Sequence, residues 1–403
     1  MREAIIDRFE LSPEFTLMLS LALRSKRPQI PERIDWQLFE TLVSKNRVEP
    51  LVAEGIRKLS PEIVRDIPAF RNLLATQSRY AALTVRQIGA LSSLMKEFGE
   101  RKIRALSVKG PILAAELYGN PALRYSRDLD ILVSGDDLEA ACGCLEELGY
   151  TEEITVRNKT PLRRRKLEEN GEEMHRVYIK EEICVELHWR LSFRMNESFD
   201  DLWENSRKKV LLGQEIRCLG EKDNTAYLIT HAAGHGYHRL RWLIDIYELQ
   251  NKTGFAFDDV YRDMAEQNVG MLLLETVLVL HLIPGFRMPE CSNGLFSIRC
   301  RDDQVCAEYE EQIERDFQKA RRLAAAVVPI IKSSTAEYGM AGRKYDRLLP
   351  TLGRKKTVFR SFLSALEPGR ADLELIDLPD GLYFLYYLIR PFNKIWRMLP
   401  FSH

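Results

Sequence analysis

The sequence predicts an α+β protein with a mixed β-sheet core flanked by N-terminal and C-terminal helical regions. Apolar residues recur every three or four positions before about residue 100 and after about residue 215, which is typical of amphipathic helices. Between these segments, short apolar runs indicate strands. The chain has 403 residues, of which 45% are hydrophobic, so it can form more than one core. We expect three regions, residues 1–95, 96–215 and 216–403.

The N-terminal region is expected to be helical throughout. Apolar residues follow helical spacing in Phe15–Leu21 and in Trp36–Val43, and a further helix is expected around residues 83–100. Prolines interrupt the pattern and indicate that these helices are short. The prolines are Pro28, Pro31, Pro61 and Pro68.

The middle region contains three apolar runs that predict strands, namely Ile103–Val108, Leu129–Val133 and Ile183–Trp189. The charged segment Val156–Glu173 is expected to be a loop. It includes four consecutive basic residues, 163–166. These residues form either a solvated basic surface or a contact for an anionic substrate.

Helical spacing returns in the C-terminal region, in Asn224–Ala233, Leu240–Gln250 and Gly270–Ile283. The last of these lies in the most apolar stretch of the chain, which is shorter than the ~20 residues that cross a bilayer. It also contains Glu275 and His281. A buried helix is therefore expected there, and no transmembrane segment.

Composition gives no sign of a polyanionic partner. Lys plus Arg and Asp plus Glu both number 59, so the net charge creates no overall field that would attract nucleic acid or a membrane. The seven cysteines lack the spacing of a disulfide framework, and the N-terminus lacks a secretory apolar core. We expect a cytoplasmic protein.

An aromatic run near the C-terminus, Tyr383–Arg390, is followed by Lys394, Trp396 and Arg397. A helix of this composition can make a peripheral contact with a membrane interface or a partner's groove. Burial against the helical region is the alternative.

The first chemical signal is a Lys-Gly pair between a strand and a helix. Lys109 and Gly110 end an apolar strand, and Pro111 suits the first turn of a helix that stops at Gly119. The unpaired N–H groups of a helix start carry partial positive charge, to which the Lys109 ammonium adds a full charge. The segment is a candidate phosphate cradle.

The second signal is the strand that contains Asp128 and Asp130. Strand alternation places both carboxylates on one face and Leu129, Ile131 and Val133 on the other. Two adjacent carboxylates repel each other unless a cation lies between them, and oxygen ligands at this spacing suit Mg²⁺. The pair is therefore a candidate metal site.

A third acid, Glu186, lies on another predicted strand. Alternation places Val185, Leu187 and Trp189 towards a core and Glu186 with His188 on the opposite face. Glu186 can join the two aspartates if the strands are neighbours. Otherwise Glu186 and His188 belong to a solvated face.

Together these segments resemble those of the polymerase-beta-type nucleotidyltransferase superfamily. More narrowly, they are similar to a family described as uncharacterised nucleotidyltransferase, whose members share a Lys-Gly helix start, an Arg before Asp-Leu-Asp, and Glu-Leu-His-Trp. The similarity extends to phrases at residues 46–52, 231–235 and 241–245 and spans roughly residues 30–290. The segment 124–130 also resembles abortive-infection toxin nucleotidyltransferases. Pro111 stands where the superfamily usually has serine, so Lys109 would replace that hydroxyl as a phosphate contact.

The resemblance implies a mixed sheet on which Asp128, Asp130 and Glu186 bind one or two Mg²⁺ or Mn²⁺ ions. A hydroxyl of the acceptor would attack the α-phosphorus of a nucleoside triphosphate such as ATP, and pyrophosphate would leave. The acceptor would be a small molecule, a peptide, a protein or RNA. The residues expected to contact the nucleotide are Lys109, Gly110, Arg124, Ser126, His231, His235, Arg241 and Asp245.

Two of these residue pairs can have a purely structural role instead of a contact with the nucleotide. His231 and His235 are four residues apart, so they share a helix face that can bind a metal, contact the nucleotide or simply pack. Ala232 follows His231 and excludes the His-Glu-x-x-His protease pattern. Arg241 and Asp245 can form an ordinary helical ion pair or lie beside the nucleotide.

Three alternatives stay open. The first is a toxin-like enzyme that nucleotidylates tRNA, another RNA or a protein. The second is a metal-dependent glycosyltransferase, which also uses Asp-x-Asp but requires a nucleotide-binding α/β unit before the motif. The third is a catalytically silent nucleotide-binding module, since a fold does not guarantee an activity.

Overall fold

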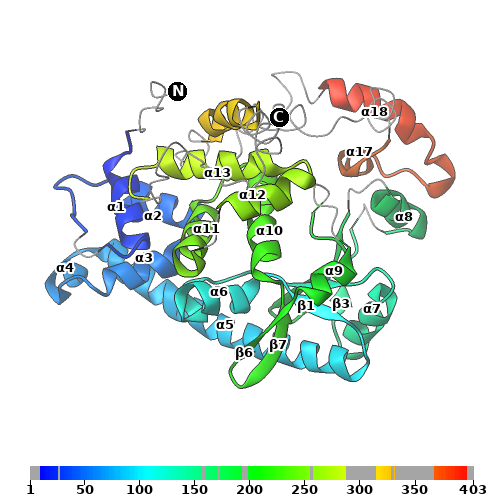
Figure 1. Cartoon of the computed structure of the whole chain (residues 1–403), viewed down its shortest axis with the longest axis horizontal. Helices are drawn as coiled ribbons and strands as arrows, with labels where there is room; N and C mark the ends of the chain where they lie inside the picture. The colour runs from blue at the N-terminus through cyan, green and yellow to red at the C-terminus, as the bar shows by residue number, and fades with distance from the viewer. Residues whose placement is uncertain are drawn as a thin grey trace, which may run out of the picture.

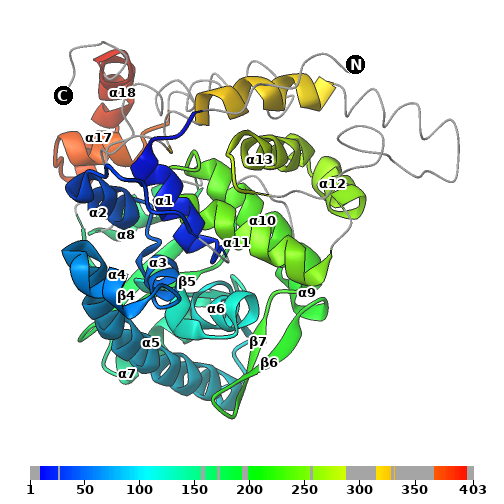
Figure 2. The ribbon, with the colours of Figure 1, turned by 90° about the vertical axis from the view of Figure 1, so that its left-hand side faces the viewer.

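The computed structural model describes residues 10–25, 28–155, 159–169, 173–192, 198–254, 257–286, 315–327, 331 and 367–396. Figures 1 and 2 show a β-sheet with α5 (Pro68–Glu100) and α7 (Leu138–Glu147) along one face and α10 (Glu221–Gly234) over the other. Helices from both ends of the chain surround the sheet, so the α+β class is confirmed.

Within the described residues, seven strands form one mixed sheet in the order β3-β4-β5-β2-β1-β7-β6. The neighbours β2 and β5 are parallel, as are β1 and β7, and the other pairs are antiparallel. The predicted strands at residues 103–108, 129–133 and 183–189 correspond to β1, β2 and β5. The strands are β1 (Ala105–Ser107), β2 (Asp128–Val133), β3 (Thr151–Glu152), β4 (His175–Lys180), β5 (Ile183–His188), β6 (Arg207–Leu211) and β7 (Gln214–Cys218).

The described part of the N-terminal region is helical, as predicted, but one helix is much longer than expected. The helix α5 spans 33 residues, so the helix predicted around residues 83–100 is only its second half. No proline interrupts the chain between Pro68 and Pro111. The helices are α1 (Pro13–Ala22), α2 (Trp36–Lys45), α3 (Glu49–Ile56), α4 (Pro61–Asp66) and α5 (Pro68–Glu100).

The two faces of the central strands differ as alternation predicts. Leu129 and Ile131 of β2 and Val185 of β5 are buried in a core shared with α5 and with α7 (Leu138–Glu147). Burying aliphatic side chains on this face stabilises the sheet by roughly 1.5–3 kcal/mol for each side chain. The opposite face is left to carry polar groups.

The strands β6 and β7 were not predicted, because their residues are charged rather than alternately apolar. They form a hairpin whose turn residues, Leu212 and Gly213, have positive φ values of 49° and 80°. A two-residue turn with left-handed residues joins antiparallel strands without splaying them. Gly213 is the local signal that could have identified the hairpin.

The predicted C-terminal helices are present and form a second core with α1, α2 and α3. Among the described residues, no helix is long and apolar enough to cross a membrane. The most apolar helix, α13, is buried as predicted. The C-terminal helices are α10 (Glu221–Gly234), α11 (Leu240–Thr253), α12 (Phe257–Glu266) and α13 (Gly270–Leu282). Two further helices, α6 (Gly110–Tyr118) and α9 (Phe199–Glu204), lie in the middle region.

The loop predicted for residues 156–173 is wrong where the structure describes it, because residues Pro161–Glu169 form the helix α8. The Thr160 hydroxyl accepts a hydrogen bond from the Arg163 backbone N–H, which caps the first turn. Leu167 packs in a small core with residues of α17 (Arg370–Leu375) and α18 (Leu385–Trp396). Tertiary packing therefore stabilises a helix whose charged sequence resembles a loop.

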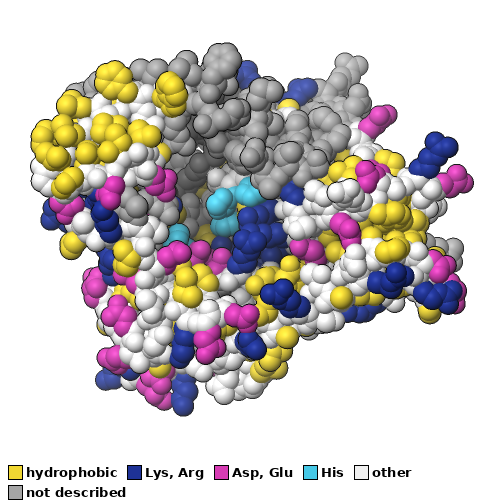
Figure 3. Space-filling model, turned by 180° about the vertical axis from the view of Figure 1, so that it is seen from behind, with side chains coloured by type: hydrophobic (Ala, Val, Ile, Leu, Met, Phe, Trp, Pro, Cys, Tyr) yellow, Lys and Arg dark blue, Asp and Glu magenta, His cyan; other side chains and the backbone are white. Residues whose placement is uncertain are grey.

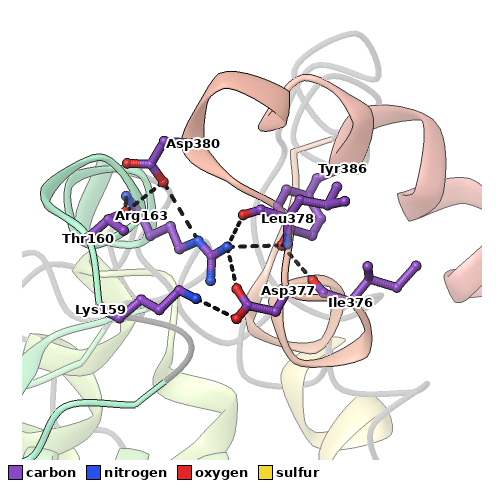
Figure 4. A network of polar contacts seen from close by, with 8 residues as sticks. All are labelled: Lys159, Thr160, Arg163, Ile376, Asp377, Leu378, Asp380 and Tyr386. Atoms are coloured by element: carbon purple, nitrogen blue, oxygen red, sulfur yellow. Dashed lines mark hydrogen bonds and ion pairs between the residues drawn. The ribbon is translucent and has the colours of Figure 1, made fainter.

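The basic residues of α8 are paired with acids. The Arg163 guanidinium lies 2.8 Å from a carboxylate oxygen of Asp377, and Thr160 donates to Asp380 at 2.8 Å. Figure 4 shows Arg163 enclosed by these groups and by Leu378 and Tyr386; we call these contacts the α8 network. The remaining ion pairs are Arg164–Glu152, Arg165–Glu169 and Lys166–Glu169. These pairings favour a structural role over a substrate contact.

The aromatic run at the C-terminus is divided between two environments. Tyr383 and Tyr386 are buried, whereas Phe384, Leu388 and Phe392 are exposed. Figure 3 shows apolar side chains gathered over this part of the molecule. Peripheral contact through α18 stays a prediction.

Candidate active site

Three carboxylates lie together on the polar face of the central strands. The strands β2 and β5 are parallel neighbours in a register that sets Asp130 opposite Glu186 and Asp128 opposite Cys184. Residues opposite each other in adjacent strands lie about 5 Å apart, and residues two apart share a face. The structure thus brings Asp128, Asp130 and Glu186 into one group, which we call the carboxylate cluster.

The two aspartates have opposite electrostatic environments. Burial raises the pKa of Asp128, and the charges of Asp130 and Glu186 raise it further. Burial also acts to raise the pKa of Asp130, but Lys109 and His188 hold it well below its usual range. The Lys109 ammonium lies 3.1 Å from Asp130 Oδ1. The charge of Asp128 is therefore less well compensated than that of Asp130.

His188 lies between two acids of the cluster. Its Nε2 atom is 3.3 Å from Asp130 Oδ1 and 3.3 Å from Glu186 Oε2. Burial alone would lower the pKa of His188, but the two carboxylates raise it to about 9. Together with Lys109, His188 therefore supplies positive charge to the cluster.

The donor set suits a hard cation. The Oδ2 atom of Asp130 is buried and makes no hydrogen bond, and a buried polar atom without a partner costs about 1–3 kcal/mol. Carboxylate oxygens are the ligands that Mg²⁺ and Mn²⁺ prefer. The unused Oδ2 and the repulsion at Asp128 fit a cation at Asp128, Asp130 and Glu186.

The helix α6 begins beside this cluster. Gly110 has a φ of 58°, a left-handed conformation that favours glycine, and Pro111 occupies the first turn. The Lys109 ammonium lies 5.2 Å from the centre of the Tyr227 ring on α10. The positive end of the helix and Lys109 therefore face the same region.

Arg124 is held inside the protein rather than at its surface. Its Nε donates to Asp245 Oδ2 at 2.8 Å, and both side chains are 1% exposed. The Tyr118 hydroxyl donates to the other oxygen of Asp245 at 2.7 Å. The Nη1 atom of Arg124 is buried and makes no hydrogen bond. Asp245 thus positions Arg124.

The other predicted contacts surround the carboxylates in different ways. Ser126 donates to Asp128 Oδ1 at 3.2 Å. Arg241 donates to the Tyr125 carbonyl at 2.6 Å, so its hydrogen bond goes there rather than to Asp245. The expected ion pair within α11 is therefore replaced by contacts with the segment that precedes β2.

His231 and His235 pack around an aromatic side chain. Their ring centroids lie 5.2 and 5.3 Å from that of Trp242. Burial and the charge of Lys109 hold the pKa of His231 well below its usual value. His231 is therefore neutral at pH 7 and lies near Lys109, next to the carboxylates.

Four arginines converge beside Asp128, and only Arg241 was predicted as a site residue. Arg47 precedes α3, Arg127 precedes β2 and Arg239 precedes α11. With Arg241 they form what we call the arginine cluster. Figure 3 shows cationic side chains next to histidines in a hollow of the surface.

The positive charges of the arginine cluster repel one another. Burial lowers the pKa of Arg239 to about 10, and the charges of Arg47 and Arg241 contribute to this shift. Burial and Arg127 likewise lower the pKa of Arg47. Among the described residues, Arg47, Arg127 and Arg239 form no ion pair within 4.0 Å, although Glu49 lies near Arg47. Unpaired guanidinium groups at this density are suited to a phosphate-bearing ligand.

A family model described as uncharacterised nucleotidyltransferase matches residues 32–284. The chain belongs to this family. The matched segment contains the carboxylate cluster, the arginine cluster and the Arg124–Asp245 pair. No curated protein and no solved structure matches the chain. Family membership supports nucleotidyl transfer as the general activity.

Proposed function

We propose that this nucleotidyltransferase transfers a nucleoside monophosphate from a nucleoside triphosphate to a hydroxyl acceptor, with Mg²⁺ or Mn²⁺ bound by Asp128, Asp130 and Glu186. One observation carries the proposal. Three carboxylates on neighbouring strands lie beside four converging arginines, none of which forms an ion pair within 4.0 Å in the described part of the chain. Metal-bound polyphosphate complements both groups.

Cationic groups on several elements would bind the triphosphate. Lys109, the start of α6 and the arginine cluster supply positive charge next to Asp128. Arginine binds phosphate oxygens with two parallel N–H groups, which orients as well as neutralises the ligand. Arg124 contributes through its free Nη1 atom or by fixing the segment before β2.

The transfer itself needs few protein groups. The acceptor oxygen forms a bond to the α-phosphorus as the bond to pyrophosphate breaks, and the acceptor's proton passes to water. Metal ions held by Asp128, Asp130 and Glu186 would supply charge neutralisation and would lower the pKa of the acceptor hydroxyl. Asp128, Asp130 and Glu186 hold the reacting groups in line, and Ser126 fixes Asp128 through its hydrogen bond.

The acceptor is proposed as a hydroxyl of a small molecule, peptide, protein or RNA, including the toxin-like targets. The glycosyltransferase alternative is not favoured, because residues 10–25 and 28–100 contain helices and no strand. The silent-module alternative predicts that nucleotide binding occurs without transfer.

A cytoplasmic location stays a prediction. The described cysteines are free thiols, namely Cys142, Cys144, Cys184 and Cys218.

The proposal is tested by incubating the protein with each α-labelled nucleoside triphosphate, Mg²⁺ and cell extract. Wild type should label an acceptor, and Asp130→Asn should not. Asp136→Asn is the matched control, because Asp136 is an exposed aspartate outside the carboxylate cluster. Equal labelling by wild type and Asp130→Asn would refute the proposed site, and nucleotide-dependent stabilisation without labelling would support the silent module.

A further inference from the structure

A second set of metal-ligand side chains lies at the edge of the carboxylate cluster. His175 of β4 is opposite His188 of β5 in the antiparallel register. Glu186 lies two residues before His188 and therefore on the same face. Ligand atoms of His175, Glu186 and His188 all lie within 4.8 Å of one another.

His188 is buried without satisfying its ring nitrogens. It is 7% exposed, and neither nitrogen makes a hydrogen bond of normal geometry. Its Nε2 is 3.3 Å from Glu186 Oε2, which is about the separation of two ligands bound tetrahedrally at 2.0–2.1 Å to Zn²⁺. The ring of His175 lies 4.8 Å from that of His188. The ligand atoms of the three side chains are therefore close enough for small side-chain rotations to bring them around one ion.

We propose that His175, Glu186 and His188 bind one divalent transition-metal ion, with Zn²⁺ as the reference ion. Two imidazoles and one carboxylate with a fourth position open is the ligand set of catalytic zinc sites. Imidazole nitrogens favour Zn²⁺ and related ions over Mg²⁺, which prefers oxygen. This site adjoins the oxygen site at Asp128, Asp130 and Glu186, with which it shares Glu186, and His188 Nε2 also lies 3.3 Å from Asp130 Oδ1.

The inference deepens the proposed function and rests on it only through Glu186, which both sites share. A hydroxyl in the open position would have its pKa lowered and would be available as the acceptor nucleophile. His175 and His188 would then determine which metal ion activates the acceptor.

The test measures metal binding by the full chain after chelator treatment, by equilibrium dialysis against Zn²⁺ and separately against Mg²⁺. Wild type should bind one Zn²⁺, and His175→Ala and His188→Ala should each bind it at least about tenfold more weakly, as loss of a ligand requires. His281→Ala is the control, because His281 lies on α13 outside the sheet. Circular dichroism of the metal-free variants checks that each one folds.

Co²⁺ provides a second measurement that does not depend on affinity. Its visible absorption should show tetrahedral coordination in wild type and should change in His175→Ala. Absence of Zn²⁺ binding by wild type, or equal binding by His175→Ala, would overturn the inference. Asp128→Asn should keep the Zn²⁺ site while losing transfer. Failure of the nucleotidyl-transfer proposal alone would appear as wild type that binds Zn²⁺ but labels no acceptor.

Discussion

The α8 network and the arginine cluster both place guanidinium groups in partly or fully desolvated surroundings, but only the first pairs them with acids. Arg163 is 1% exposed and contacts Asp377, whereas Arg47 and Arg239 have no ion pair within 4.0 Å among the described residues. Ion pairs in the α8 network join α8 to the segment between α17 and α18 (Figure 4). Charges that a fold leaves unpaired cost stability unless a ligand binds them.

The Arg124–Asp245 pair lies between these two cases. Arg124 is as buried as Arg163. Its partner Asp245 is buried too, with a side chain that is 1% exposed, against 48% for Asp377, the partner of Arg163. Yet Arg124 keeps one unsatisfied nitrogen beside the carboxylate cluster. The pair therefore stabilises the fold and positions a cationic group in the site.

The largest expected effect is that of Asp128→Asn on transfer. Removing a charge that binds the metal should lower the transfer rate by at least about 10³-fold. Because the pKa of Asp128 is raised in the fold, its ionised form destabilises the metal-free protein at pH 7, and a neutral amide should leave the melting temperature unchanged or higher. A lower melting temperature without metal would show that Asp128 stabilises the fold.

The second-largest expected effect is the loss of stability caused by Asp245→Ala. It leaves Arg124 buried without a counter-charge, which should lower the free energy of unfolding by about 3–5 kcal/mol. Urea denaturation measures this change. Asp259→Ala, at an exposed acid of α12, is the control, and an equal loss in both variants would argue against a special role for the pair.

Arg47→Ala and Arg239→Ala should weaken binding of inorganic tripolyphosphate by about 10- to 100-fold each, the loss expected for a charge-assisted contact. Calorimetric titration measures the affinity. The matched control is Arg165→Ala, since Arg165 is paired with Glu169 in α8. Tripolyphosphate affinity that falls equally in all three variants would remove the distinction between the two regions.

The smallest effect is expected from Arg163→Met. The change removes the donor to Leu378 and the ion pair with Asp377 and should lower the free energy of unfolding by about 1 kcal/mol. Transfer activity and tripolyphosphate affinity should stay at wild-type values. A fall in either would place the α8 network in the functional site.

Local patterns in the sequence determined which segments of this protein form its central strands and several of its helices. Alternation around Asp128 and Asp130 predicted a strand with carboxylates on one face, because the period of two is a property of the strand itself. Helical spacing predicted α10, α11 and α13 for the same reason. The hairpin β6–β7 and the helix α8 were missed, because charged residues hide the apolar period on which such predictions depend.

Tertiary structure decided which distant groups meet. Arg47, Arg127 and Arg239 are separated by 80 and 112 residues, and no local pattern relates them. The partners of Arg124 and Arg241 likewise depend on how α11 packs against the segment before β2. Periodicity describes which face a side chain occupies, whereas ion pairs and ligand sites depend on long-range packing that brings those faces together.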